Sequence, residues 1–412
     1  MTNAEFDLRI AGPNLGRIGR AFDVQNLPAE AYRFEGSLKR SGDSYAVNNL
    51  VAEVGENDLS GSFGLEIAPR IRLTGRLEST HLNLASLRGQ NDDVTEPEED
   101  APKPDRLIPD TPLPLQVLDA GDVDMSLRLH HLATERQDIG DVEFKIVIEE
   151  DKLHVETGKV VLSNGGTLTA ALDLARTAPD HANLHTSILA RQVNFREAVD
   201  ADGNSITRPR RDLELSLSGN GSTVRDLAAS ADGSISLQLG EGDIDNDFSG
   251  YLMRDMVAQL FSAINPLAKE AKHTRLNCGF LVFDIVDGVA RGRAVGLQTD
   301  KLSVASVGTL NLATEALDLS FRIKEREGVG ISLGSVINPY VKVGGTLASP
   351  ALHIDKKRGF LSGTVAVLTG GLSILAQGVW DRYLSQDNYC QAVVEALESG
   401  EIPTWDGTTG NQ

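Results

Sequence analysis

Large aromatic side chains are scarce in this sequence of 412 residues, which has two tryptophans, six tyrosines and twelve phenylalanines against forty glycines. A chain of this length would ordinarily form about two or three domains, each with a thick core. So few large side chains cannot fill cores of that kind, whereas glycine suits a structure with many turns. The composition therefore favours a thin, repetitive β architecture over a compact catalytic domain.

Positive charge is also in short supply. Lysine and arginine total 39 against 59 acidic residues, a formal net charge of −20. Nucleic acid and anionic membrane surfaces attract proteins through a positive footprint. A small basic patch, residues 208–211, has no aromatic residues between its arginines. We therefore expect no nucleic-acid partner and interpret the patch as a solvated loop.

The motifs of catalysis and metal binding are missing from the chain. There is no P-loop, no G-x-G-x-x-G, no G-x-S-x-G and no H-E-x-x-H, so phosphate, nucleotide and hydrolase chemistry lose their usual signatures. The two cysteines, Cys278 and Cys390, are too few and too distant in sequence for a zinc site. Composition alone makes them free buried thiols. We expect no enzyme activity, cofactor or metal.

The first residues contain no secretory signal, because no basic start is followed by an apolar run. Phe6, Leu8 and Ile10 instead alternate with polar residues, as in the middle of a sheet. A strand at this position would need an earlier partner. A cytoplasmic protein and a fragment of a longer protein both fit, and we favour the fragment.

What the chain does contain is a repeated module. Segments beginning at Tyr45, Leu153 and Val289 can be laid over one another, and each reads as a strand, a polar turn and a second strand. Apolar residues alternate in the second strand of each copy, which gives one apolar and one wet face. The alternating residues are Leu59, Phe63, Leu65 and Ile67; Leu168, Leu172 and Leu174, with Ala170 between them; and Val304, Leu310 and Leu312.

Further alternating runs precede and follow each copy, so the repeating unit is a meander of about four antiparallel strands joined by hairpins. Meanders of this kind must share their apolar faces along one large sheet. The sequence predicts a mainly β fold, namely an elongated, twisted antiparallel sheet of meander modules that forms a curved groove, with a few short helices. We divide the chain into a first β module (1–90), an acidic linker (91–106), a second module (107–200), a third module (201–355) and a C-terminal segment (356–412).

The linker is marked by its composition. Asn91–Asp105 holds seven acidic residues, one lysine and three prolines, which predicts a disordered loop. Three segments have helical patterns instead, at 13–22, 222–230 and 248–267. We interpret the long third one as a cover for a sheet edge or end, with a binding role as the alternative.

The C-terminal segment contains 22 residues without a charge, from Gly359 to Trp380. That length is enough to span a bilayer. Its large apolar residues recur at intervals of three and four, however, which predicts an amphipathic helix that docks on the sheet in preference to crossing a membrane. The residues of that apolar stripe are Leu361, Val365, Leu368, Leu372, Leu375 and Val379.

A broad apolar face with few large residues to cover it would be an exposed hydrophobic groove. Acyl chains suit a continuous groove that lacks specific polar anchors. The repeats also resemble, nearly along the whole chain and in the same order, the C-terminal portion of AsmA family proteins of Gram-negative bacteria. The resemblance rests on AGPNLGRIG from Ala11, YRFEGSLKRSGDSYAVNNLVAEV from Tyr32, GRLESTHLNLASL from Gly75, RLIPDTPLPLQVLDAGDVDMSLRL from Arg106, LSNGGTLTAALDL from Leu162, LSLSGNGSTVRDLAASADGSISL from Leu215, TRLNCGFLVFDIVDGVA from Thr274 and VKVGGTLASPALHID from Val341.

This resemblance implies a periplasmic β body, normally anchored in the inner membrane, that acts in outer-membrane biogenesis. It also implies a link to outer-membrane protein assembly and, through the related bridge-like lipid transfer proteins, to phospholipid movement between membranes. The family's N-terminal membrane anchor is missing from this sequence. Because the periplasm is oxidising, the resemblance changes the expectation for the cysteines to a Cys278–Cys390 disulfide that ties the C-terminal segment to the sheet.

Two functions remain open at this point. The apolar face either binds or conducts phospholipid, or it is packed and the protein is a scaffold or regulator of outer-membrane protein assembly and of protein targeting to the membrane. An enzyme is disfavoured because no clustered carboxylates recur along the repeats. The expected partners are a phospholipid or another acyl-chain lipid, outer-membrane assembly factors, and the inner membrane through the missing anchor.

Overall fold

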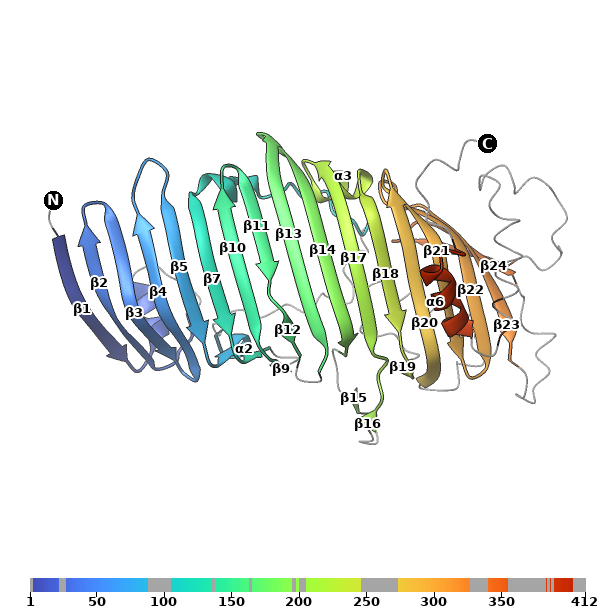
Figure 1. Cartoon of the computed structure of the whole chain (residues 1–412), viewed down its shortest axis with the longest axis horizontal. Coiled ribbons are helices and arrows are strands. Elements are labelled where there is room, and N and C mark those ends of the chain that lie inside the picture. The colour runs from blue at the N-terminus through green and yellow to red at the C-terminus, as the bar shows by residue number, and fades with distance from the viewer. Residues whose placement is uncertain are drawn as a thin grey trace. The chain divides into compact units, whose positions relative to one another are not determined.

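The computed structural model describes residues 3–21, 27–87, 105–134, 138–162, 165–194, 198–199, 205–245, 273–326, 340–354, 383, 386 and 389–402. The chain divides into two compact units. Unit 1 comprises Met1–Pro102 and Pro114–Arg196, and unit 2 comprises Lys103–Leu113 and Glu197–Gln412. Figure 1 shows that strands dominate both units, so the predicted mainly β fold with few short helices is confirmed.

Unit 1 is built on one twisted sheet of long strands, with a small second sheet of β6, β8 and β9 at one end of them. Its elements are β1 (Asn3–Gly12), α1 (Leu15–Ala21), β2 (Tyr32–Ser41), β3 (Ser44–Val54), β4 (Asn57–Glu66), β5 (Arg72–Ser79), β6 (Leu82–Asn83), α2 (Leu84–Leu87), η1 (Leu115–Asp119), β7 (Asp122–Leu129), β8 (Leu132–Ala133), β9 (Asp138–Ile139), β10 (Val142–Glu149), β11 (Lys152–Thr157), β12 (Val160–Val161), β13 (Thr167–Ala178) and β14 (His181–Val193).

Most neighbours in unit 1 are hairpins, as the meander pattern predicts. In the β10–β11 hairpin, Glu149 faces Lys152, and the two residues between them, Glu150 and Asp151, both have positive φ. Such a two-residue turn matches the right-handed twist of the flanking strands. Short turns of this type keep successive strands adjacent and in register.

One junction departs from the predicted antiparallel order. β5 and β7 pair in parallel, with Leu73 beside Val123 and Leu77 beside Leu127. Parallel neighbours need a long crossover connection, because a hairpin reverses the chain direction. The connection from Ser79 to Asp122, which contains the acidic linker, supplies that length. The linker itself lies largely outside the described residues.

Unit 2 continues the same architecture with its own strands and two described helices. Its elements are β15 (Ala198–Val199), β16 (Ser205–Ile206), β17 (Arg211–Gly221), α3 (Val224–Ala229), β18 (Asp232–Leu239), β19 (Gly242–Asp245), β20 (His273–Val286), β21 (Val289–Thr299), β22 (Leu302–Asn311), β23 (Leu317–Glu325), β24 (Tyr340–Gly345), β25 (Pro350–Ile354) and α6 (Tyr389–Glu398).

Two of the four predicted helices are found, and the other two lie outside the residues that the structure describes. α1 and α3 fall within the predicted 13–22 and 222–230, and a capping box of Thr223 and Asp226 starts α3. The predicted helix at 248–267 and the apolar stripe Leu361, Val365, Leu368, Leu372, Leu375 and Val379 lie outside the described residues. Within the described part of the chain, no helix is both long and apolar enough to cross a bilayer.

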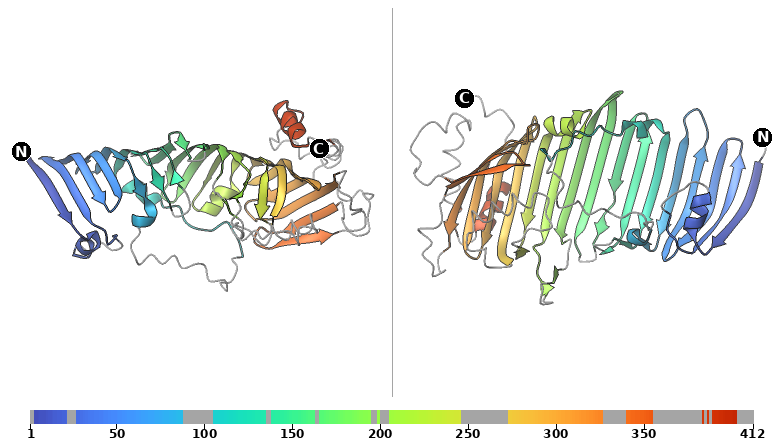
Figure 2. Two further views of the ribbon diagram at one scale, coloured as in Figure 1. Left: turned by 90° about the horizontal axis from the view of Figure 1, so that it is seen from below. Right: turned by 180° about the vertical axis from the view of Figure 1, so that it is seen from behind.

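The C-terminal helix α6 packs on strands β20–β22 of unit 2 (red in Figure 2). Tyr389 and Val393 of α6 are fully buried against Phe280 and Val282. The Tyr389 hydroxyl donates to the Val304 carbonyl at 3.1 Å. A disulfide joins Cys278 on β20 to Cys390 on α6, so the structure pairs the two cysteines that the resemblance pairs.

Candidate functional site: the apolar face of unit 1

Strand register places the predicted apolar residues of the first module on one face of the sheet. On β4, Leu59 faces Ala52 of β3, and Phe63 lies between Val47 of β3 and Gly75 of β5. Leu65 is likewise flanked by Tyr45 and Leu73. Paired residues in a sheet point to the same side. Ile67 follows the end of β4 and is exposed.

The predicted residues of the second module lie on the same face, because the register continues strand by strand from β4 to β14. Val155 on β11 faces Leu172, and Leu153 faces Leu174. Leu168 lies beside Val160 and Ala190. One row of paired residues, here named the central row, crosses ten strands: Phe6, Leu38, Val47, Phe63, Gly75, Met125, Ile146, Val155, Leu172 and Thr186.

The central row is open along its length. Each of its ten residues is half-buried or exposed. Phe6 is 60% exposed to solvent and Ile146 is 38% exposed. None carries a charge, and only Thr186 has a polar side chain. With strands about 4.8 Å apart, the row extends on the order of 40 Å. This continuous apolar surface is the candidate site, and we call it the apolar face.

On strands β7–β14, apolar residues at both strand ends are buried, whereas those of the central row are not. At one end of the apolar face, Leu129, Val142, Val160 and Ala190 are buried. At the other end, Ile148, Leu174 and Ala182 are buried. On these strands the apolar face is therefore an open strip between two closed margins, which we call the β8 rim and the η1 rim after the elements that lie there.

The η1 rim is fixed by two arginines. Arg176 donates to the Leu115 carbonyl at 2.6 Å and pairs with Asp119 at 2.9 Å. Arg70 donates to the Leu118 carbonyl at 3.1 Å. Leu118 is completely buried. These contacts hold η1 at the ends of the strands, because a helix of five residues is not stable by itself.

The β8 rim is a small sheet that side-chain hydrogen bonds tie to β4. β8 pairs with β6 in parallel and with β9 in antiparallel fashion. Asn57, which points to the apolar side of β4 by register, donates to the Ser86 hydroxyl at 2.9 Å and accepts from the Asn83 N–H at 2.6 Å. The rim elements therefore lie on the same side of the sheet as the apolar face.

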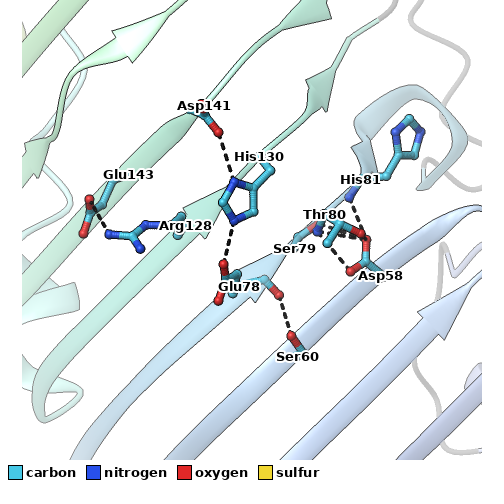
Figure 3. Close-up of polar contacts among 10 residues, drawn as sticks. All are labelled: Asp58, Ser60, Glu78, Ser79, Thr80, His81, Arg128, His130, Asp141 and Glu143. Atoms are coloured by element: carbon cyan, nitrogen blue, oxygen red, sulfur yellow. Dashed lines mark hydrogen bonds and ion pairs between the residues drawn. The ribbon is translucent and has the colours of Figure 1, made fainter.

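The opposite face of unit 1 is charged (Figure 3). Arg128 pairs with Glu143 at 3.1 Å across β7 and β10. His130 lies between Glu78 and Asp141, with Nε2 2.6 Å from Glu78 Oε1 and Nδ1 3.0 Å from Asp141 Oδ1. The hydrogen bonds to Glu78 and Asp141 raise the pKa of His130. This face therefore carries the polar residues of the alternating strands.

These polar groups offer little chemistry. Both ring nitrogens of His130 are bonded to carboxylates, which leaves neither available as a general base. His81 and His131 stack at 5.0 Å between ring centres. Among the described residues, no group of three or more histidine, cysteine, aspartate or glutamate side chains is arranged to hold a metal ion. The apolar face is thus the most distinctive surface of unit 1.

The predicted residues of the third module lie in unit 2 and are packed differently. Val304 is buried in a cluster with Leu317, Phe321 and Ile323. Leu310 is half-buried against that cluster, and Leu312 follows β22 and contacts the neighbouring cluster around Ile285. The predicted set therefore divides into open residues in unit 1 and mostly covered ones in unit 2.

Several residues of the apolar face were not among those predicted from sequence. Met125, Ile146 and Val155 lie between the two predicted groups on β7, β10 and β11. The signal for Ile146 is the alternation of Val142, Phe144, Ile146 and Ile148, which marks an apolar strand face as clearly as the repeats do. Arg70 and Arg176, which fix η1, have no sequence signal because their partners are distant in the chain.

Comparison with known proteins identifies relatives of the chain. The AsmA family matches residues 25–295. The AsmA family protein YhjG of Escherichia coli (strain K12) is 22% identical over 405 residues, which cover 91% of this chain and 57% of that protein. The chain thus spans little more than half the length of this curated relative. No solved structure matches it.

Proposed function

The chain belongs to the AsmA family, and from this premise we propose that it acts in outer-membrane biogenesis by binding the acyl chains of phospholipid along the apolar face of unit 1. The protein works without catalysis. Its setting is the periplasm, with attachment to the inner membrane. Bound lipid would pass between inner and outer membrane.

The observation that carries this proposal is the open central row. An uninterrupted apolar strip on a soluble sheet is costly to expose to water and usually marks a binding surface. The strip is uncharged along ten strands, whereas the reverse face carries the charges. Acyl chains fit a surface that offers contact area and no fixed polar anchors.

The rims support the same proposal. On strands β7–β14, apolar residues at both strand ends are buried and the middle is open. A sheet whose whole apolar face was meant to pack on a partner domain would not need separate covers at its margins. A strip bounded on two sides instead limits a long ligand to lie across the strands, parallel to the central row.

A second function is favoured by unit 2. There Val304 and Phe321 are buried within the unit's own cluster, which is the pattern of a structural core. On this alternative the protein is a scaffold or regulator of outer-membrane protein assembly and targeting, and its partner is an assembly factor. The difference between the two functions lies in what covers the apolar face of unit 1.

Charge substitution on the two faces of β13 tests the proposal. Leu172 is on the apolar face, and Thr169, three residues earlier, is on the reverse face beside Leu189. We expect Leu172→Glu to remain folded by circular dichroism but to lose at least about tenfold of its co-purifying phospholipid, since a carboxylate repels acyl chains. Thr169→Glu should keep its lipid. Mass spectrometry of the purified proteins measures both.

Two results would contradict lipid binding. One is wild-type protein that carries no phospholipid and takes up none from vesicles of phosphatidylethanolamine. The other is a Leu172→Glu protein that unfolds while Thr169→Glu does not, because that outcome identifies Leu172 as a core residue and favours the scaffold.

A further inference from the structure

The first two residues of β4 hold the segment that follows β5 in unit 1. Asp58 accepts from the Thr80 N–H at 3.0 Å and from the His81 N–H at 2.6 Å (Figure 3). Asn57 accepts from the N–H of Asn83, on β6, at 2.6 Å. Neighbouring residues of a strand point to opposite faces of the sheet. The segment is therefore held from both faces as it passes into the β8 rim.

The side-chain amide of Asn57 is buried and bonded at both its nitrogen and its oxygen. Asn57 is 4% exposed. Its nitrogen donates to the Val54 carbonyl at 3.0 Å and to the Ser86 hydroxyl at 2.9 Å, while its oxygen binds the Asn83 N–H. A buried amide is costly unless its polar groups are paired. These three bonds offset that cost.

The position calls for an apolar residue. Asn57 lies two residues before Leu59, in phase with Phe63 and Leu65 on the apolar side of β4. The bond to Val54 closes the turn between β3 and β4, but the other two bonds reach 26 and 29 residues along the chain. In coiled coils a buried asparagine in an apolar row specifies one arrangement at some cost in stability. The long-range bonds indicate the same role here.

The β8 rim depends on such attachments because its strands are very short. β6, β8 and β9 have two residues each and pair with one another. A sheet this small is not stable by itself. Asn57 ties its β6 side to β4, and the Gly140 N–H, which donates to the Val161 carbonyl at 3.1 Å, ties its β9 side to β12. Loss of the first attachment should therefore loosen β6 directly.

We propose that Asn57 is a positioning residue for the apolar face of unit 1. Its bonds to Asn83 and Ser86 keep β6, and with it the β8 rim, against the sheet, and so set where the open strip ends. With these bonds removed, the rim loosens and the strip widens toward this end of the strands. The consequence for lipid rests on the proposed function, whereas the hold on the rim is independent of lipid.

Hydrogen exchange on the full chain tests the hold on the rim. In Asn57→Leu we expect exchange at residues 82–87 and 132–133 to increase by about tenfold or more, while β10, β11, β13 and β14 stay unchanged. Asn48→Leu is the matched control, because Asn48 is an exposed asparagine on the neighbouring strand β3. An increase confined to residues 54–57 would show that Asn57 only closes its turn, and would overturn the proposal.

Ser86→Ala keeps the proposal decidable even if Asn57→Leu unfolds. Ser86 is exposed, and its replacement removes one of the two long-range bonds of Asn57. We expect exchange at residues 82–87 to rise, by less than in Asn57→Leu. The same change should have a smaller effect when Asn57→Leu is already present, because the shared bond is then gone. Unchanged exchange in Ser86→Ala, or full additivity in the double variant, would overturn the proposal.

Uptake of fluorescently labelled phosphatidylethanolamine from vesicles tests the consequence for lipid. We expect faster uptake by Asn57→Leu and Ser86→Ala than by wild type and Asn48→Leu. Faster exchange in β6 with unchanged uptake would overturn the role of the rim in lipid access. A wild-type protein that takes up no lipid refutes the proposed function, and the exchange measurements still decide whether Asn57 holds the β8 rim.

Discussion

His130 connects three strands of unit 1 on the face opposite the apolar residues. It contacts Glu78 at the end of β5 and Asp141 just before β10, and it follows the last residue of β7. All three side chains are largely exposed, so solvent screens their attraction. The contact is a modest support for the parallel β5–β7 junction, and its strength depends on whether His130 is protonated.

The raised pKa of His130 sets the sign of a pH prediction. The protonated ring is favoured in the folded state, so its stabilising effect is fully present below the ordinary histidine pKa of about 6.5 and is lost as the pH rises through the folded value. We expect His130→Gln to lower the melting temperature at pH 5.5 and to leave it nearly unchanged at pH 9. Thermal unfolding followed by circular dichroism measures this.

Lys145→Gln is a suitable control for that measurement. Lys145 lies on the same charged face, on β10, but it is not one of the partners of His130. Its effect should not change between pH 5.5 and pH 8. Equal destabilisation by His130→Gln across that range would show that the imidazole acts through packing alone.

At the scale of elements, α6 covers an apolar face of strands β20–β22. Phe280 and Val282 alternate with Leu281 and Phe283, so β20 is apolar on both faces. A sheet region with two apolar faces needs a cover on each side. α6 covers one of them with Tyr389, Val393 and Ala396, and burial raises the pKa of Tyr389.

The disulfide should contribute strongly to the stability of this arrangement. Cys278 and Cys390 are 112 residues apart, and closing a loop of about 100 residues stabilises by roughly 4–5 kcal/mol in the chain-entropy model. We expect dithiothreitol to lower the free energy of unfolding of unit 2 and to speed hydrogen exchange in α6. Denaturant titration with and without reductant measures the first effect.

The control for reduction is a protein with both cysteines replaced, Cys278→Ala with Cys390→Ala, which should be insensitive to dithiothreitol. A thiol assay can contradict the role of the disulfide. Two reactive thiols in protein purified from an oxidising compartment would show that the bond does not form there, and the stabilisation would then rest on the packing of Tyr389 and Val393 alone.

At the scale of the whole molecule, the two units bury their apolar residues to different extents. Unit 2 has packed clusters around Phe280, Val304 and Ile285. The central row of unit 1 has no buried member. A domain that leaves its apolar strip open loses part of the free energy that drives folding. Unit 1 is therefore the part of the chain whose stability should respond to a ligand.

Lipid should stabilise unit 1 selectively. A ligand at about 100 times its Kd adds about 2.7 kcal/mol to the unfolding free energy of the unit that binds it. We expect delipidated protein to exchange faster in β4–β14 and to recover protection when phosphatidylethanolamine is added, while β20–β23 remain unchanged. Hydrogen exchange with mass spectrometry resolves the two units. Equal effects on both units would contradict a site confined to unit 1.

Local sequence patterns account for much of the fold and for the composition of the apolar face. The alternation of Leu59, Phe63 and Leu65, repeated at Leu168, Leu172 and Leu174, predicted strands and the face to which they point. Period-two alternation and turn residues are properties of neighbouring positions, so they can be read directly. The turn between β20 and β21 is an example: Val286 pairs with Val289, and the two residues between them, Asp287 and Gly288, both have positive φ.

Only the tertiary structure decided which parts of that face are open. Sequence treats Leu172 and Val304 alike, yet one is half-buried on an open strip and the other is packed in a cluster. The parallel β5–β7 junction and the arginines that fix η1 likewise depend on residues tens of positions apart. Alternation determines the side to which a residue points, whereas burial depends on which distant segments come to lie against it.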